Sequence, residues 1–205
     1  MLEKYSKKQL EADPRWFKDL FIDTSMIKNV HGIDMLGKNP TDRGRMATKM
    51  SVLVDHNTVP VACVFYPANV SDSQTAIETV DAIRCPLTKD KRYKQTIVGD
   101  KGYVSKNIEL ELKSRNMKLL TPRKRKTHAR PLTKKEREIL SHRHKVENCF
   151  CRLDKFKKIH CRNEKSILSF KSLTFLAITV IVSKYIEIAS HNASRDEMFS
   201  HCFSV

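Results

Sequence analysis

Three carboxylates stand where they could meet and bind hard cations. Asp23 follows the short apolar run 20–22, Asp100 follows a predicted strand at 95–99, and Glu147 lies in a predicted helix. If the two strands are neighbours, their ends meet in a crevice of the kind where open α/β sheets place ligands. Oxygen ligands favour Mg²⁺ or Mn²⁺, and two such ions about 4 Å apart support in-line displacement at phosphorus. We therefore expect Asp23 to bridge two ions, with Asp100 holding one and Glu147 the other.

A guanidinium accompanies the third acid. Arg143 precedes Glu147 by four residues, which places both side chains on one face of a helix. That helix is predicted from about 133 to 157, because Thr133 and Glu136 form a capping box at its start. Arg143 could orient Glu147 or contact a phosphate oxygen.

Structural roles for the same residues are the alternative. An arginine and a glutamate four apart are most often a surface ion pair that contributes little to stability. Asp23 could be a turn residue or a helix cap, and Asp100 lies between Gly99 and Gly102, where an acid is ordinary in a turn. The spacing alone leaves both readings open.

The overall charge points to a polyanionic partner. The 205 residues carry a formal net charge of +16 and a pI of about 9.7, which suits nucleic acid. Arg123, Lys124, Arg125 and Lys126 form an unbroken basic run in a predicted loop and are expected to contact phosphates. The apolar run 173–182 is shorter than the roughly 20 residues of a membrane span, so a buried core helix, no membrane partner and a cytoplasmic, DNA-associated protein are predicted.

The six cysteines show no disulfide spacing, so reduced thiols inside a cell are expected. A zinc site from Cys149, Cys151, His160 and Cys161 is disfavoured. Two cysteines that are two residues apart on a helix point in different directions.

The hydrophobic patterns predict an α/β domain. Five strands are expected near 20–23, 46–55, 59–66, 95–99 and 117–120, and helices near 73–84, 105–115, 133–157 and 167–188. A meander followed by alternating elements implies a mixed five-stranded sheet with helices on both faces. We expect an N-terminal arm at 1–16, one catalytic domain at 17–188 and a polar tail at 189–205.

Four short blocks, in this order, resemble DDE transposases of bacterial insertion sequences, nearest to the group around insertion sequence five. They are Phe21-Ile-Asp23-Thr-Ser25, Ala68-Asn-Val-Ser-Asp72-Ser, Val98-Gly-Asp100-Lys-Gly102-Tyr103, and Arg143-x3-Glu147 with Phe150 and Arg152-Leu153 behind it. The likeness runs from about residue 17 to 188.

The resemblance implies a ribonuclease-H-like fold and a transposase that uses two magnesium or manganese ions. Such an enzyme cuts DNA at the ends of its element and joins the freed 3′-hydroxyl to target DNA. Asp23, Asp100 and Glu147 would be its catalytic acids and metal ligands. Arg143 would be the arginine of the family's Tyr-x2-Arg-x3-Glu-x6-Lys signature and would face DNA.

The chain departs from that signature at two positions. Leu140 replaces the tyrosine, and Asp154 replaces the lysine, with Lys155 beside it as a substitute DNA contact. Only 22 residues precede Asp23, so no helix-turn-helix segment is expected there. The predicted partners are element ends, target DNA, a second copy of the chain, and an upstream-frame protein that supplies an end-binding domain. The competing predictions are a metal-dependent endonuclease on the same fold and a DNA-binding remnant without catalysis.

Overall fold

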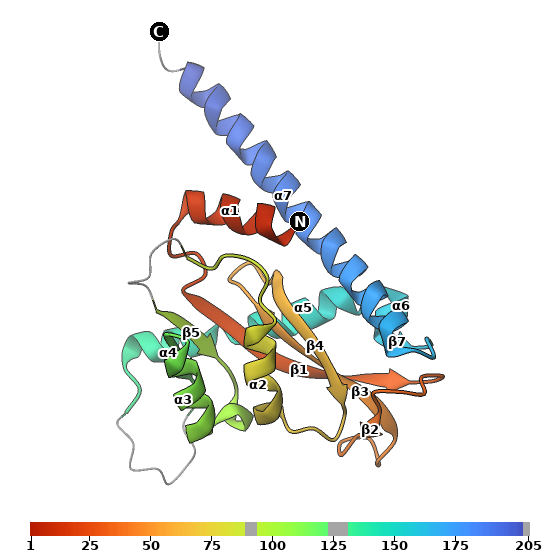
Figure 1. Cartoon of the computed structure of the whole chain (residues 1–205). Helices are drawn as coiled ribbons and strands as arrows, with labels where there is room; N and C mark the ends of the chain where they lie inside the picture. Colours follow the sequence, from red (N-terminus) through yellow and green to blue (C-terminus); the bar gives the residue numbers. More distant parts are fainter. Residues whose placement is uncertain (89–93, 123–130, 203–205) are drawn as a thin grey trace.

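The protein is a mixed β-sheet covered by helices, as predicted (Figure 1). This computed structural model describes residues 1–88, 94–122 and 131–202, with side chains as far as Ile186. The strands are β1 (Asp19–Asn29), β2 (Gly37–Lys38), β3 (Met46–Val54), β4 (Pro60–Pro67), β5 (Gln95–Val98), β6 (Met117–Leu120) and β7 (Cys161–Arg162). The helices are α1 (Leu2–Ala12), α2 (Asp72–Asp81), η1 (Lys101–Tyr103), α3 (Lys106–Ser114), α4 (Lys134–Ser141), α5 (His144–Leu153), α6 (Lys157–His160) and α7 (Ile167–Cys202).

Five strands form the body of the sheet. β3 pairs antiparallel with both β4 and β1, and β1, β5 and β6 run parallel to one another. The order β2-β3-β1-β5-β6, with β4 on β3 and β7 on β1, gives seven strands in all. The predicted count of five is therefore short by β2 and β7. Each has two residues, too few to leave an alternating pattern in the sequence.

The central strand β1 is longer than predicted. It continues through Asp23 to Asn29, because β3 pairs with it from Phe21 to Lys28. Asp23 therefore lies in the middle of the strand, and its predicted place at the strand end is wrong. Parallel pairing with β5 stops at Phe21 opposite Val98. From here until β7 pairs with Lys28 and Asn29, only the β3 edge of β1 is paired.

The single helix predicted for 133–157 is two helices with a tight turn between them. The capping box at Thr133 starts α4 as expected, with Thr133 Oγ1 accepting from the Glu136 N–H at 3.1 Å. At the junction the backbone hydrogen bonds join residues three apart, as in a 3₁₀ helix. The Arg143 N–H donates to Leu140 O at 3.2 Å, and the Val146 N–H donates to Arg143 O at 3.2 Å. Such bonds tighten the coil, and they separate α4, which ends at Ser141, from α5, which begins at His144.

Helix α5 packs on β1 and β3, whereas α2 packs on β3 and β4. Alternating β1 residues separate the two sides. Thr24 bonds to Asp72 of α2, and Asp23 lies beside Arg143 at the start of α5. The acid of β1 therefore points to the α5 side of the sheet.

The long helix α7 closes one side of the core and extends away past α1 (Figure 1). Phe170, Ala177, Ile178 and Val182 are buried against the body. By length and composition, Ile167–Ile186 could also cross a membrane, at a mean hydropathy of 1.6. The helical apolar segment is thus longer than the predicted run 173–182, and only 33% of its most apolar window is buried inside the protein.

Candidate active site

The first acid, Asp23, lies between a backbone donor and a guanidinium. Asp23 Oδ1 accepts from the Thr24 N–H at 2.8 Å, and Asp23 Oδ2 lies 3.7 Å from Arg143 Nη1. On its other side, Arg143 Nη2 lies 3.5 Å from Glu147 Oε1. The Arg143–Glu147 pair is more than a surface contact, because the same guanidinium reaches a carboxylate of the central strand.

The parallel pairing of β1 and β5 places the second acid, Asp100, near Asp23. Phe21 lies opposite Val98, and Asp23 and Asp100 each come two residues later. Asp100 is also the N-cap of η1, as its turn-like sequence suggested, with Oδ1 accepting from the Gly102 N–H at 2.7 Å. This bond occupies only one carboxylate oxygen.

Burial and neighbouring charge both act on Asp23. Burial raises the pKa of Asp23 to about 6, the negative charges of Asp100 and Asp72 add to the increase, and the Thr24 N–H and Arg143 oppose it. Asp100 and Glu147 therefore interact with Asp23 in different ways. Asp100 acts directly through its charge, whereas Glu147 is joined to Asp23 through Arg143.

The donor set fits a hard cation, but the present side-chain arrangement does not form a cage. Among residues 1–88, 94–122 and 131–202, no three His, Cys, Asp or Glu side chains stand close enough to hold one ion. The Arg143 guanidinium lies between Asp23 and Glu147. An ion bound by both acids would require this guanidinium to move aside. All the candidate ligands are oxygens, and a cation would relieve the repulsion that raises the Asp23 pKa.

Asp72 and Lys49 belong to the site although neither was predicted. Lys49 Nζ donates to Asp72 Oδ1 at 2.6 Å and to Val70 O at 2.5 Å, and only 4% of the Lys49 side chain is exposed. Thr24 Oγ1 donates to the same Asp72 oxygen at 2.8 Å. The network fixes the residue next to Asp23 from the α2 side. Lys49 lies on the more polar side of an alternating strand, so the sequence did not mark it as buried.

Asp100 and Asp72 both lie close to Gly102. A Cβ at Gly102 would lie 2.9 Å from Asp100 Oδ1 and 3.6 Å from Asp72 Oδ2. Next to them, the buried Tyr103 hydroxyl has no hydrogen-bond partner in the described part of the chain. Burial raises the Tyr103 pKa, with added effects from Asp23, Asp72 and Asp100, so this hydroxyl stays a neutral dipole beside the acids.

The predicted DNA contacts fall in three places. Arg143 lies among the acids, Lys155 is exposed just after α5, and the run Arg123, Lys124, Arg125 and Lys126 lies outside the described residues. Asp154 caps the end of α5 and lies 3.8 Å from His160 Nδ1. Cys149 is buried and Cys151 exposed, which agrees with the argument against a shared zinc ion.

The raised pKa of Asp23 makes a stability prediction. The unfolded carboxyl ionises near 4 whereas the folded one holds its proton to about 6, so folding stability falls as the pH rises through this window. Asp23→Asn removes that loss. The variant should be more stable than the wild type above pH 6, on the order of 1–3 kcal/mol, with the difference shrinking towards pH 4.

Urea denaturation at several pH values between 4 and 7 measures this difference. Asp42→Asn, in the loop before β3, is the matched control for the loss of one carboxylate. A difference between Asp23→Asn and wild type that does not change with pH would show that burial does not hold the proton on Asp23.

Comparisons with known proteins agree with the geometry. A family model described as the transposase DDE domain matches residues 18–182. A curated protein from Burkholderia cepacia, named for the transposase of insertion sequence element IS402, is 28% identical over 136 residues, which cover 63% of this chain and 59% of that protein. The chain thus spans less than two thirds of the length of this relative.

Solved structures add the fold. A piggyBac transposase synaptic complex with hairpin DNA is similar at a TM-score of 0.52 and 13% identity, over 88% of this chain and 48% of that one. The catalytic domain of Mos1 mariner transposase aligns at a TM-score of 0.35 and 10% identity, over 74% of this chain and 90% of that one. The predicted ribonuclease-H-like α/β class is confirmed. Membership of the insertion-sequence-five group stays a prediction.

Proposed function

Because this chain belongs to the transposase DDE domain family, we propose that it cuts DNA at the ends of a mobile element and joins the 3′-hydroxyl to target DNA. The observation that carries the proposal is the bridge from Asp23 through Arg143 to Glu147, with Asp100 beside Asp23. These acids come from separate parts of the chain. Packing them together costs electrostatic energy that a structural role does not explain.

In this proposal Asp23, Asp100 and Glu147 hold two Mg²⁺ or Mn²⁺ ions. Bound ions of this kind lower the pKa of water and stabilise the leaving oxygen of an in-line displacement at phosphorus. Asp23 is the half-buried ligand, held at one oxygen by the Thr24 N–H, and Glu147 is the exposed one. Arg143 holds Glu147 near Asp23 without metal, and its guanidinium is free to turn to a phosphate oxygen once ions replace it.

A supercoiled plasmid that carries the element's terminal repeat tests the activity. Incubation with the protein and Mg²⁺ should give nicks at the repeat, and a second plasmid should receive the freed end. Nicking without joining would favour the metal-dependent endonuclease. Binding without nicking would favour the catalytically impaired remnant, to which Leu140 and Asp154 at signature positions lend weight. The homodimer and the upstream-frame protein remain predictions.

The basic run 123–126 is proposed to contact DNA phosphates. Replacing Arg123, Lys124, Arg125 and Lys126 by alanine should weaken duplex binding to a similar extent for all sequences. The slope of log affinity against log salt should fall by about 0.9 for each phosphate contact that is lost. Gel shifts between low and moderate salt give this slope.

The exposed lysines of α1 provide the control for net charge. Replacing Lys4 and Lys7 by alanine removes two positive charges from α1, which carries none of the three acids. If this variant lowers the salt slope as much per charge as the 123–126 variant does, the effect reflects total charge and the loop makes no specific phosphate contact.

A further inference from the structure

The outward face of α7 is uncharged over about four turns of helix. Every exposed residue from 167 to 183 is a leucine, a phenylalanine, a valine or a serine. The exposed fraction is 71% at Leu168, 61% at Leu176 and 46% at Phe175. Isolated exposed apolar residues are ordinary, but a contiguous row of them marks an interaction surface. We call this surface the α7 stripe, and it consists of Leu168, Ser169, Ser172, Phe175, Leu176, Thr179, Val180 and Ser183.

Three of the four hydroxyls in the α7 stripe donate to carbonyls of the helix itself. Ser172 Oγ donates to Leu168 O at 3.0 Å. Thr179 Oγ1 donates to Phe175 O at 2.9 Å, and Ser183 Oγ donates to Thr179 O at 2.9 Å. From Ser172 onward the stripe therefore has no side-chain donor left for a partner. A strand or loop laid on it would bury unpaired backbone carbonyls, whereas a helix pairs its own backbone groups internally.

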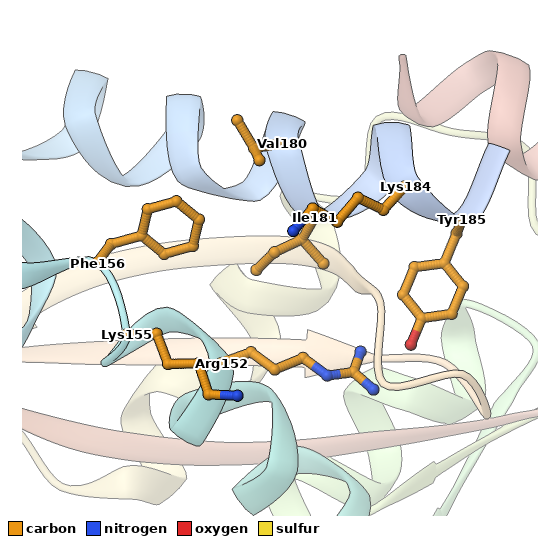
Figure 2. A pocket seen from close by; sticks show the side chains of 7 residues that line it. All are labelled: Arg152, Lys155, Phe156, Val180, Ile181, Lys184 and Tyr185. Atoms are coloured by element: carbon orange, nitrogen blue, oxygen red, sulfur yellow. The ribbon is translucent and has the colours of Figure 1, made fainter. Parts of the chain in front are cut away.

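Hollows lie on both sides of the stripe. Leu176 and Val180 line one of about 280 Å³ between α6 and α7. Phe175 lines another of about 330 Å³ towards α1 and β4. Figure 2 shows Val180 on the outer side of α7 and Ile181 on the side towards α5. Two helices pack by placing the side chains of one in the grooves beside the ridges of the other, and this relief suits a helix better than a flat bilayer surface.

The rim of the stripe is positively charged. Lys171 and Lys184 border it on α7, and Lys157 and Lys158 line the hollow towards α6. Among the described residues, Lys158 lies 3.8 Å from Glu164, and the other three lysines form no ion pair. A second copy of this chain would bring the same lysines to the same rim, and a net charge of +16 opposes self-association. Carboxylates on the partner complement the rim.

We propose that the α7 stripe docks an amphipathic helix of a partner protein, one with an apolar seam and with Asp or Glu along both edges of that seam. Leu168, Phe175 and Leu176 recur at helical spacing and form the contact for the seam. The lysine rim selects the acidic edges. This surface is independent of the three acids and of the DNA that the proposed function requires.

Three fluorescent peptides of about 20 residues, long enough to form helix in isolation, test the proposal on the full chain without DNA. One is an amphipathic helix with a leucine seam and glutamate edges. The second has the same composition in scrambled order, and the third has lysine in place of the edge glutamates. Fluorescence anisotropy should show that the acidic helix binds at least about tenfold more tightly than either of the other two.

Leu176→Asn removes an apolar contact from the centre of the stripe. The variant should bind the acidic helix about tenfold more weakly than wild type. Leu110→Asn is the matched control, because Leu110 is 65% exposed on α3, and it should bind as wild type does. Thermal melting of both variants checks that they fold.

Two lysine variants separate the rim from the total charge. Lys184→Gln should reduce the preference for glutamate edges over lysine edges. Lys4→Gln removes the same charge from an exposed residue of α1 and should leave that preference unchanged. Equal effects of the two variants would show that the net charge of the chain attracts the acidic peptide, and would overturn the proposal.

Other results would also overturn it. Equal affinity for the acidic helix and its scramble, or for glutamate and lysine edges, would show that the stripe does not select such a helix. A wild-type dimer in light scattering that Leu176→Asn dissociates would assign the stripe to a second copy. Sedimentation with phosphatidylglycerol vesicles that needs Leu176, without selection among the peptides, would assign it to a membrane surface. Since no measurement contains DNA, these failures leave the proposed DNA-processing function untouched.

Discussion

If Asp23 holds the ions as proposed, Asp23→Asn is expected to reduce metal-dependent nicking by at least about a thousandfold, because such a ligand would contribute several kcal/mol to the transition state. The amide keeps the size of the side chain and can still accept from the Thr24 N–H. Duplex binding should stay within about twofold of wild type. Plasmid nicking in Mg²⁺ and gel shifts without metal measure the two effects.

The stability of the same variant separates lost chemistry from lost structure. Because burial raises the Asp23 pKa to about 6, Asp23→Asn should melt higher than wild type at neutral pH in metal-free buffer. Mn²⁺ should raise the melting temperature of the wild type but not that of the variant. Asp42→Asn should nick at the wild-type rate. If the Asp23→Asn variant still nicks DNA at the wild-type rate, Asp23 is not a metal ligand.

Spacing predicted the contact between Arg143 and Glu147 because it follows local rules. A spacing of four places Arg143 and Glu147 on one face in any helix, and their contact survives the break before α5. Asp100 followed from the end of a short apolar strand. The pairing that aligns Asp23 with Asp100 needs β1 and β5 to be neighbours, which the sequence permits without requiring it.

The missed features all depend on contacts between distant segments. The strand β1 extends to Asn29 because β3 pairs with it, and no local pattern in residues 24–29 marks this. The predicted helix breaks after Ser141, although no proline or glycine there indicates a break. Lys49 reads as the solvent face of an alternating strand, yet α2 covers that face and supplies Asp72 as its partner.

The ion pair between Lys49 and Asp72 gives the second large predicted effect, a loss of folding stability. Asp72→Ala leaves the Lys49 ammonium, whose side chain is 4% exposed, with only the Val70 carbonyl as a partner. An uncompensated buried charge costs about 3–5 kcal/mol. Asp72 is itself 34% exposed, so the loss should fall at the lower end, about 3 kcal/mol.

The double variant shows how much of this loss belongs to the stranded charge. Lys49→Met in the Asp72→Ala background removes the ammonium and keeps an apolar chain of similar length, so most of the stability should return. A deficit of about 1 kcal/mol should remain, because the Thr24 hydroxyl loses its acceptor and α2 loses an acid in its first turn.

Asp81→Ala is the matched control on the same helix. Asp81 is 51% exposed and pairs with Arg115 at 2.7 Å, and an exposed pair of this kind contributes at most about 1 kcal/mol. Urea denaturation of the wild type and the three variants gives each free energy of unfolding. If Asp72→Ala costs no more than Asp81→Ala, or if Lys49→Met restores nothing, Lys49 does not depend on Asp72 for its charge. The residue beside Asp23 would then be held by the strand pairing of β1 alone.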